Sequence, residues 1–177
     1  MNNPDAQQPI VVVDYDPTWP RLYEEEHTRI VSLIGDFLEE IHHVGSTSIP
    51  GLAAKPVIDI LAIVSTLHMV ERCVKPLARI DYAYFDENGI PGRHYFRKPS
   101  DISFQQHTHH LHMMTREHEQ VRAMLDFRDY LRVHPESLRE YQDLKRELAV
   151  RYRTDRNLYT DAKASLVTSI LHSAGKE

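Results

Sequence analysis

The amino-acid sequence predicts an α/β protein in which a sheet flanked by helices is followed by a purely helical segment. Two observations indicate this class. Residues 57–64 are an apolar run of strand length with a single acid, and residues 116–177 show only the helical spacing of apolar side chains. An almost continuous apolar strand is covered on both faces, which is typical of the centre of an α/β sheet. With 177 residues, the chain is long enough for one domain with a helical addition.

The N-terminal part is expected to contain a strand, a helix and a second strand. Residues 10–15 are β-branched and apolar over the length of a strand. Residues 16–18 suit a helix start, since aspartate or threonine can cap a helix and Pro17 fits its first turn. Apolar side chains three and four residues apart predict that this helix reaches about residue 35, and residues 37–44 then read as a short strand.

A loop precedes the expected central strand. Residues 45–56 contain two glycines, two prolines and three hydroxyl side chains, a composition typical of a loop. The apolar strand of residues 57–64 follows directly. Apolar side chains between residues 67 and 77 then predict a helix, which Pro76 kinks or restarts.

Three more strands are expected before the chain becomes purely helical. Two short runs, residues 82–85 and 93–97, flank a turn, and residues 102–114 contain another strand. In that strand His110 and His112 share one face, because successive side chains of a strand point to opposite faces.

We expect the chain to divide into an α/β body, residues 9–115, and a C-terminal helical segment, residues 116–177, that packs on the body. Within the helical segment, Pro135 marks the restart of a helix and Thr160 can cap the last one.

Composition excludes several classes of protein. The chain carries 21 basic and 26 acidic residues, a formal net charge of −5, which argues against nonspecific binding to nucleic acid. No apolar run reaches the roughly 18 residues needed to cross a bilayer, so no membrane partner is expected. Cys73 is the single cysteine, which excludes an internal disulfide framework. Because residues 1–8 are polar and lack a secretory apolar region, we expect a cytoplasmic protein. The 12 histidines are the compositional outlier, and four of them lie within residues 107–112.

The loop that begins at Gly45 is the first candidate site. A glycine at a strand end lets backbone N–H groups approach a phosphate, and three hydroxyls can add hydrogen bonds, those of Ser46, Thr47 and Ser48. A tight turn capped by a hydroxyl explains the same residues, and turn chemistry alone favours it. Lys55 can neutralise a phosphate as a point charge, or it is a solvated loop lysine.

Asp59 is the one acid in the apolar strand, where a carboxylate without a partner is costly to bury. It is either paired with Lys55 or a histidine, or it lies at the sheet edge, or it is a metal ligand or general base at a strand end. His110 and His112 have the spacing of metal ligands on one strand face, and they can equally form a polar strand surface. Arg93 can contact a phosphate through two hydrogen bonds, or it lies on the surface.

A long ordered motif, HVGSTSIPGLAAKPVIDI at residues 43–60, closely resembles the GrpB family, small bacterial proteins that also occur as a domain fused to dephospho-CoA kinase. The resemblance continues in shorter motifs, namely DPTW at 16–19, GRHYF at 92–96, HLH at 110–112, FRDYLR at 127–132, LK at 144–145 and YTDAK at 159–163. It covers about residues 10–174.

The family is similar in fold to the nucleotidyltransferase superfamily. That similarity implies a mixed sheet flanked by helices, a Gly-Ser loop that holds nucleotide phosphates, and strand carboxylates that hold divalent metal. Gly45 and Ser46 match the Gly-Ser element, and Asp59 matches the first carboxylate. The second carboxylate would lie two residues on, where this chain has Leu61, which puts an ordinary two-Mg²⁺ site in doubt. The cation is then different, single or absent, and the candidate ligands of one Mg²⁺, Mn²⁺ or Zn²⁺ ion are Asp59, His110 and His112.

Three functions follow as hypotheses. The first is an enzyme that holds a nucleotide or other phosphate ester on the loop of residues 45–48 and transfers a nucleotidyl or phosphoryl group, with Asp59 and one divalent cation in the site. The second is a module that binds a nucleotide or CoA-like ligand without catalysis, which Leu61 favours. The third is a protein-interaction scaffold, in which the helices of residues 116–177 bind a partner unless they close over the ligand. The substrate, the acceptor and the oligomeric state stay open.

Overall fold

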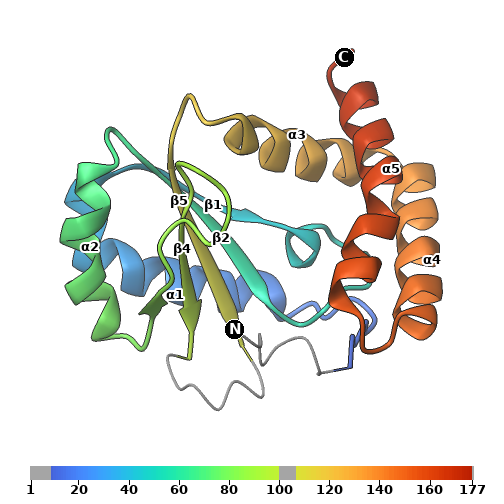
Figure 1. Ribbon diagram of the computed structural model, residues 1–177, viewed down its shortest axis with the longest axis horizontal. Coiled ribbons are helices and arrows are strands. Elements are labelled where there is room, and N and C mark those ends of the chain that lie inside the picture. Colours follow the sequence, from blue (N-terminus) through green and yellow to red (C-terminus); the bar gives the residue numbers. More distant parts are fainter. Residues whose placement is uncertain (1–8, 100–106, 177) are drawn as a thin grey trace.

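The structure is a computed structural model that describes residues 9–99 and 107–176. Its central feature is a five-stranded sheet in the order β1-β2-β5-β4-β3 (Figure 1). The strands are β1 Leu38–Val44, β2 Ile58–Val64, β3 Ala83–Tyr84, β4 His94–Lys98 and β5 His109–Thr115. The helices are α1 Trp19–Ile34, α2 His68–Ala78, α3 Glu119–Val133, α4 Pro135–Arg151 and α5 Arg156–Ala174, with short 3₁₀ turns at Gly35–Phe37 and Ser46–Ser48.

The sheet is mixed, as the resemblance to the GrpB family implies. Strand β2 runs parallel to β5 and antiparallel to β1, while β4 runs antiparallel to both β5 and β3. The expected central strand is confirmed, because β2 has a strand on each side and buries every residue except Asp59. Its apolar side chains alternate between the two faces and are covered on both.

Helices cover the two faces of the sheet. On one face, α1 and α2 bury apolar side chains such as Ile30 and Leu77 against Ile60 of β2 and Leu111 of β5. On the other face, α3 packs through Val121 against a cluster of strand residues, namely Val44, Leu61, Ile63 and Met114. The helical spacing of the apolar residues in each helix gives it the buried stripe that this packing requires.

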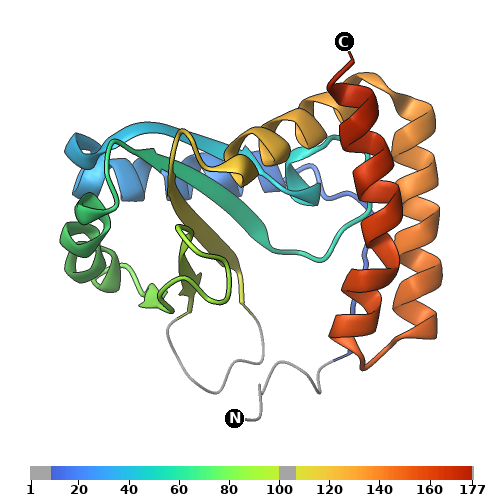
Figure 2. The ribbon, with the colours of Figure 1, turned by 45° about the horizontal axis from the view of Figure 1, so that its top comes forward.

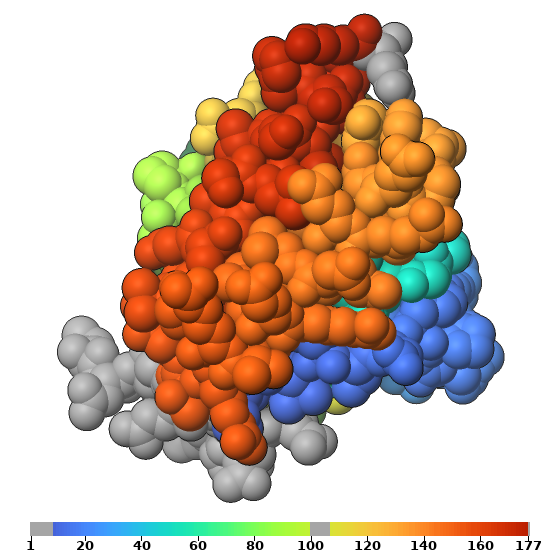
Figure 3. Space-filling model, turned by 90° about the vertical axis from the view of Figure 1, so that its right-hand side faces the viewer, coloured from blue at the N-terminus to red at the C-terminus, as the bar shows by residue number. Residues whose placement is uncertain are grey.

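Helices α4 and α5 stand side by side at one end of the molecule, with α2 at the other end (Figure 2). Together they form much of the face seen in Figure 3. They contact the loop between β1 and β2, since Ile49 and Leu52 pack against Tyr141 of α4 and Ile170 of α5. All strands in the described part of the chain lie before residue 116, and a domain boundary near residue 115 remains our proposal. Among the described helices, none has the length and apolar character needed to cross a membrane.

The strand expected at residues 10–15 is wrong. This segment makes one isolated bridge, between Val13 and Ala54, and Val13 remains 38% exposed. The segment runs to the helical end of the molecule instead, where the Ile10 N–H donates to the carbonyl oxygen of Arg153 at 2.8 Å. Its β-branched residues therefore reflect packing against helices rather than pairing in the sheet, a distinction that a short apolar run cannot make.

The start of the first helix also differs in detail from the prediction. Helix α1 begins at Trp19, and the proline in its first turn is Pro20 rather than Pro17. The Asp16 carboxylate accepts a hydrogen bond from the Thr18 N–H at 2.8 Å, which orders the turn before the helix. For β5, the part of the predicted range from 102 to 106 lies outside the described residues.

A buried ion pair joins α1 to β4, and the sequence alone does not indicate it. The Glu26 side chain is 1% exposed, and the Lys98 Nζ donates to its two carboxylate oxygens at 2.9 and 3.0 Å. Arg29 adds a longer contact of 3.3 Å. A buried charge that keeps its partner is tolerated, whereas one that loses its partner strongly destabilises the fold.

We expect Glu26→Gln to lower the free energy of unfolding by about 3 kcal/mol, because the Lys98 ammonium would lose its counter-charge. Glu25→Gln is the matched control on the same helix, since Glu25 is exposed and its pair with Arg21 contributes little. Urea unfolding followed by circular dichroism measures both. Equal stability of the two variants would contradict the ascribed role of the pair.

Candidate functional site

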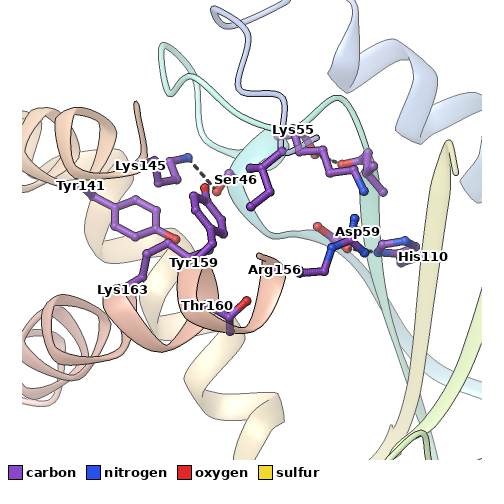
Figure 4. A pocket seen from close by; sticks show the side chains of 13 residues that line it. Ser46, Lys55, Asp59, His110, Tyr141, Lys145, Arg156, Tyr159, Thr160 and Lys163 are labelled. Atoms are coloured by element: carbon purple, nitrogen blue, oxygen red, sulfur yellow. Dashed lines mark hydrogen bonds and ion pairs between the residues drawn. The ribbon is translucent and has the colours of Figure 1, made fainter. Parts of the chain in front are cut away.

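A cavity of about 230 Å³ opens between the start of β2 and the pair of helices α4 and α5 (Figure 4). In Figure 4, Asp59 and His110 lie on one side of it, and Lys145, Tyr141 and Lys163 lie on the other. The full lining comprises Ile10, Ser46, Thr47, Lys55, Val57, Asp59, His110, Tyr141, Lys145, Arg156, Tyr159, Thr160 and Lys163.

The parallel pairing of β2 with β5 brings the predicted acid and imidazoles together. The register sets Asp59 opposite His110, and Leu61 opposite His112. His110 Nδ1 lies 3.1 Å from Asp59 Oδ1, and His112 Nε2 lies 3.8 Å from the same oxygen. The structure therefore places the three side chains in one cluster, although 51 positions separate Asp59 from His110.

The electrostatics of this cluster keep Asp59 ionised. Burial opposes its ionisation, but the hydrogen bond with His110 and the nearby imidazole of His112 outweigh burial and hold the pKa of Asp59 well below its ordinary value. Burial lowers the pKa of His112. The Asp59 side chain remains 30% exposed and lines the cavity, so it presents a carboxylate there at neutral pH.

Gly45 lets the loop lie directly against Asp59. Its φ of +71° is a conformation that side chains with a Cβ rarely adopt. A Cβ built at this position would lie 2.5 Å from Asp59 Oδ2, far inside van der Waals contact. Glycine is therefore required here by both backbone conformation and space.

The three hydroxyls of the loop have different roles. Thr47 Oγ1 donates its one proton to the carbonyl oxygen of Val57 at 3.0 Å, so it accepts from His43 Nε2, also at 3.0 Å. Ser48 Oγ donates to the Gly45 carbonyl at 2.6 Å. These two hydroxyls stabilise the turn, in agreement with the alternative of a tight turn capped by hydroxyls. Ser48 is absent from the cavity lining. Ser46 Oγ accepts from the Lys145 ammonium at 3.1 Å and lines the cavity.

Cationic side chains gather in the cavity wall opposite Asp59. Lys145 is 3% exposed and donates to Ser46 Oγ and to the carbonyl oxygen of Ala53. Burial lowers the pKa of Lys145 to about 7 and that of Lys163 to about 8. The side chain of Arg156 reaches across the cavity towards Asp59 (Figure 4).

Sequence reasoning did not select Lys145, Arg156 or Lys163 as site residues. They belong to helices whose placement against the sheet cannot be read from helical periodicity. The available signal was that basic side chains interleave with the apolar stripe of these helices, and that two of them fall in motifs shared with the GrpB family, LK and YTDAK.

Arg93 is not brought to the cavity. It is 9% exposed, and its Nη2 donates to the carbonyl oxygens of Glu87 at 3.4 Å and Asn88 at 3.1 Å. Its guanidinium also lies over the Tyr95 ring, 5.2 Å from the ring centre. In this structure Arg93 holds a turn, and the predicted phosphate contact stays a prediction.

The predicted metal ligands contact one another directly. Among the described residues, no group of three or more His, Cys, Asp or Glu side chains is arranged to hold a metal ion. One carboxylate and two imidazoles favour ions softer than Mg²⁺. His110 uses Nδ1 for Asp59, and its buried Nε2 has no hydrogen-bond partner within the described part of the chain. The ligand set of Asp59, His110 and His112 therefore stays a prediction.

Comparisons with known proteins identify relatives over nearly the whole chain. The sequence profile described as GrpB protein matches residues 9–173. The UPF0157 protein YqkA of Bacillus subtilis is 37% identical over 154 residues, which are 87% of this chain and 44% of that protein. The chain thus spans less than half the length of this relative. Glutamate-rich protein GrpB of Alkalihalophilus pseudofirmus is 34% identical over 92% of this chain and 94% of its own length.

Solved structures resemble the fold. The crystal structure of conserved protein GrpB from Enterococcus faecalis has a TM-score of 0.86 at 34% identity, and covers 94% of this chain and 98% of that one. Cid1 poly(U) polymerase, in a structure described as MgGTP bound, has a TM-score of 0.53 at 13% identity over 79% of this chain and 45% of its own. That likeness confirms the nucleotidyltransferase-like fold and carries no function.

A dephospho-CoA kinase of Mycolicibacterium paratuberculosis is a further relative in sequence. It is 36% identical over 80 residues, 44% of this chain and 20% of its own length.

We expect Gly45→Ala to destabilise the protein more than Gly89→Ala does. Both glycines have positive φ, +71° and +82°, but a Cβ at Gly89 meets nothing within 4 Å. The control measures the strain of a positive φ, about 1–2 kcal/mol, and any excess at Gly45 measures the clash with Asp59 together with the further strain of a ψ of −177°. Urea unfolding gives both values, and equal losses would show that the loop does not press on the carboxylate.

Proposed function

The chain belongs to the GrpB family, and from this starting point we propose that it binds the phosphate groups of a nucleotide or another phosphate ester in the cavity between β2 and the α4–α5 pair. The observation that carries the proposal is the gathering of basic side chains around the cavity, namely Lys55, Lys145, Arg156 and Lys163. Basic groups that converge on a partly enclosed space favour an anion with several charges.

Each of these groups has a distinct use for phosphate. Lys145 is withdrawn from water, so its attraction to an anion is weakly screened. The Ser46 hydroxyl accepts from Lys145 and also forms a hydrogen bond with Tyr141, and a phosphate oxygen could replace Tyr141 as its partner. Arg156 offers a planar fork of donors, and Lys55 and Lys163 add point charges.

One divalent cation belongs to the proposal as a partner of the phosphates. Mg²⁺, Mn²⁺ or Zn²⁺ would be held through Asp59 with His110 and His112, where it would neutralise charge between the carboxylate and the ligand. The residues of this chain would bind and orient the phosphate ester.

Binding is the part of the function that the geometry supports best, and nucleotidyl or phosphoryl transfer is the second candidate. An ionised Asp59 beside the same cavity favours transfer, because a carboxylate can hold a cation or accept a proton there. Leu61 opposes it, since this residue is fully buried among apolar neighbours where a second carboxylate would be needed.

The helical segment takes part in the proposed site. Three of the four basic residues around the cavity lie in α4 and α5. This placement favours a role in which the two helices close over the ligand, rather than one in which they bind a protein partner. Deleting residues 116–177 would remove those residues together with part of the core.

We expect the affinity for MgATP to fall about tenfold between pH 7 and pH 9. The pKa values of Lys145 and Lys163, about 7 and about 8, mean that both lose their charge over this range. The charge of the phosphates is nearly constant there, because their second pKa is about 6. Isothermal titration calorimetry, with and without Mg²⁺ or Mn²⁺, measures the profile.

Variants separate the site from general effects of pH. Lys145→Met should weaken binding at pH 7 and flatten the profile, while Lys75→Met, a change at an exposed lysine of α2, should leave both unchanged. Wild-type affinity in Lys145→Met would reject the proposed phosphate site.

We expect Asp59→Asn to abolish any transfer of label from α-labelled ATP while ATP itself remains bound by the basic side chains of the cavity, because the carboxylate acts in the chemical step. A loss of at least about 100-fold is the size that removal of a general base produces. Asp143→Asn, at an exposed position of α4, is the control. An unchanged rate in Asp59→Asn would exclude this carboxylate from the reaction. If the wild-type protein binds ATP but transfers no label, the hypothesis of a binding module without catalysis is the one that stands.

A further inference from the structure

Two arginines of α3 hold the two ends of the turn that starts at Gly45, and we propose that Arg128 and Arg132 are positioning residues that set this turn for ligand binding. Neither lines the cavity. They line a separate surface hollow of about 300 Å³, together with His43 and Ser48. The ligand part of this inference rests on the proposed function of the cavity.

The hydrogen bonds of the two guanidinium groups bracket the turn. Arg128 Nη1 donates to the carbonyl oxygen of His43 at 3.0 Å. Arg132 donates from both Nε and Nη2 to the carbonyl oxygen of Ser48, at 3.2 and 2.8 Å. The residues between these two carbonyls include Gly45 and Ser46, the ones that face Asp59 and Lys145. Charged donors make stronger hydrogen bonds than neutral ones, so both ends are firmly held.

An acid on the same helix orients the arginines. Asp129 accepts from Arg128 Nε at 2.7 Å and from Arg128 Nη2 at 2.9 Å, and it lies 3.6 Å from Arg132 Nη1. The hydrogen bonds from Arg128 lower the pKa of Asp129, which keeps it charged. With two nitrogens of Arg128 directed at Asp129, the planar geometry of the guanidinium directs Nη1 to the loop.

Hydrogen bonds inside the turn fix its shape but not its position relative to α3. The Ser48 N–H and hydroxyl both donate to the Gly45 carbonyl, at 3.1 and 2.6 Å. The arginines add the connection to α3. Beside Arg132, Leu131 packs with Tyr141 of α4 in one cluster. Helix α3 therefore sets Ser46 relative to the helices that carry the cations of the cavity.

Arginine is needed at position 132 for its geometry as well as its charge. Two donors of one rigid plane meet a single carbonyl oxygen, which a lysine ammonium on a flexible chain does not reproduce. An Arg→Lys change keeps the charge and removes the fork, so it tests positioning rather than electrostatics.

The experiment combines amide hydrogen exchange of the free protein with calorimetry of MgATP binding for Arg128→Lys and Arg132→Lys. We expect the amides of Ser48 and Ile49, which donate within the turn, to exchange about tenfold faster, and the affinity for MgATP to fall about tenfold. The amides of β2 should keep their protection. Arg122→Lys, at an 83% exposed position of the same helix, should change neither measurement.

Each other outcome has a definite meaning. Unchanged exchange at Ser48 and Ile49, or an equal acceleration in β2, would overturn the positioning role. Faster exchange with wild-type affinity would overturn its link to the ligand. If the wild-type protein binds no MgATP, the proposed function fails and takes the ligand link with it, whereas the exchange data still decide whether the arginines hold the turn.

Discussion

The pairing of two parallel strands, β2 and β5, is the constraint on which the candidate site depends. Parallel neighbours begin at the same edge of a sheet, so the second residue of each strand meets its counterpart there, Asp59 opposite His110. A carboxylate at that place needs a partner, which the imidazole supplies. The adjoining turn can lie against the carboxylate only because Gly45 has no side chain. The β2–β5 register thus sets the acid opposite the imidazole, and the antiparallel β1–β2 register, with Val44 opposite Asp59, brings the turn to the same place.

Charge in this protein is arranged locally rather than overall. The chain has a net charge of −5, yet its cavity gathers four basic side chains around one carboxylate. Burial makes Lys145 reluctant to stay protonated, and a bound anion would reverse that tendency. A ligand with several negative charges would therefore offset the free-energy cost of keeping the buried Lys145 ammonium charged in the unliganded site. The overall charge argues against nonspecific binding along nucleic acid, and the local cluster of basic side chains is the basis of our proposal that the ligand is a small polyanion.

The sequence predicts the sheet side of the site well, because strand geometry is simple. Alternation along a strand puts His110 and His112 on one face, and the single acid in an apolar run draws attention to Asp59. The helical side escapes prediction for the converse reason. Periodicity shows that α4 and α5 are helices, but only tertiary packing decides that Lys145 faces the sheet. Glu26 escapes too, since nothing in its sequence neighbourhood distinguishes a buried acid from an exposed one.

Apolar composition alone leads to one wrong prediction, the strand at residues 10–15. Residues 10–15 have the β-branched character of a strand, and they pack on helices because strand and helix surfaces accept the same side chains. The number of hydroxyl side chains in a loop is equally ambiguous as a signal. Three hydroxyls in a row indicate a phosphate loop or a capped turn, and here Thr47 and Ser48 hold the turn, while Ser46 and Thr47 line the cavity.

A crystal structure of the protein with MnATP tests the central claim most directly, since anomalous scattering locates the metal independently of the nucleotide. We expect the phosphates to lie in the cavity, within hydrogen-bond distance of Ser46, Lys145 and Lys163, with the metal on the side of Asp59. Nucleotide bound at another surface, with the cavity filled by water alone, would contradict it.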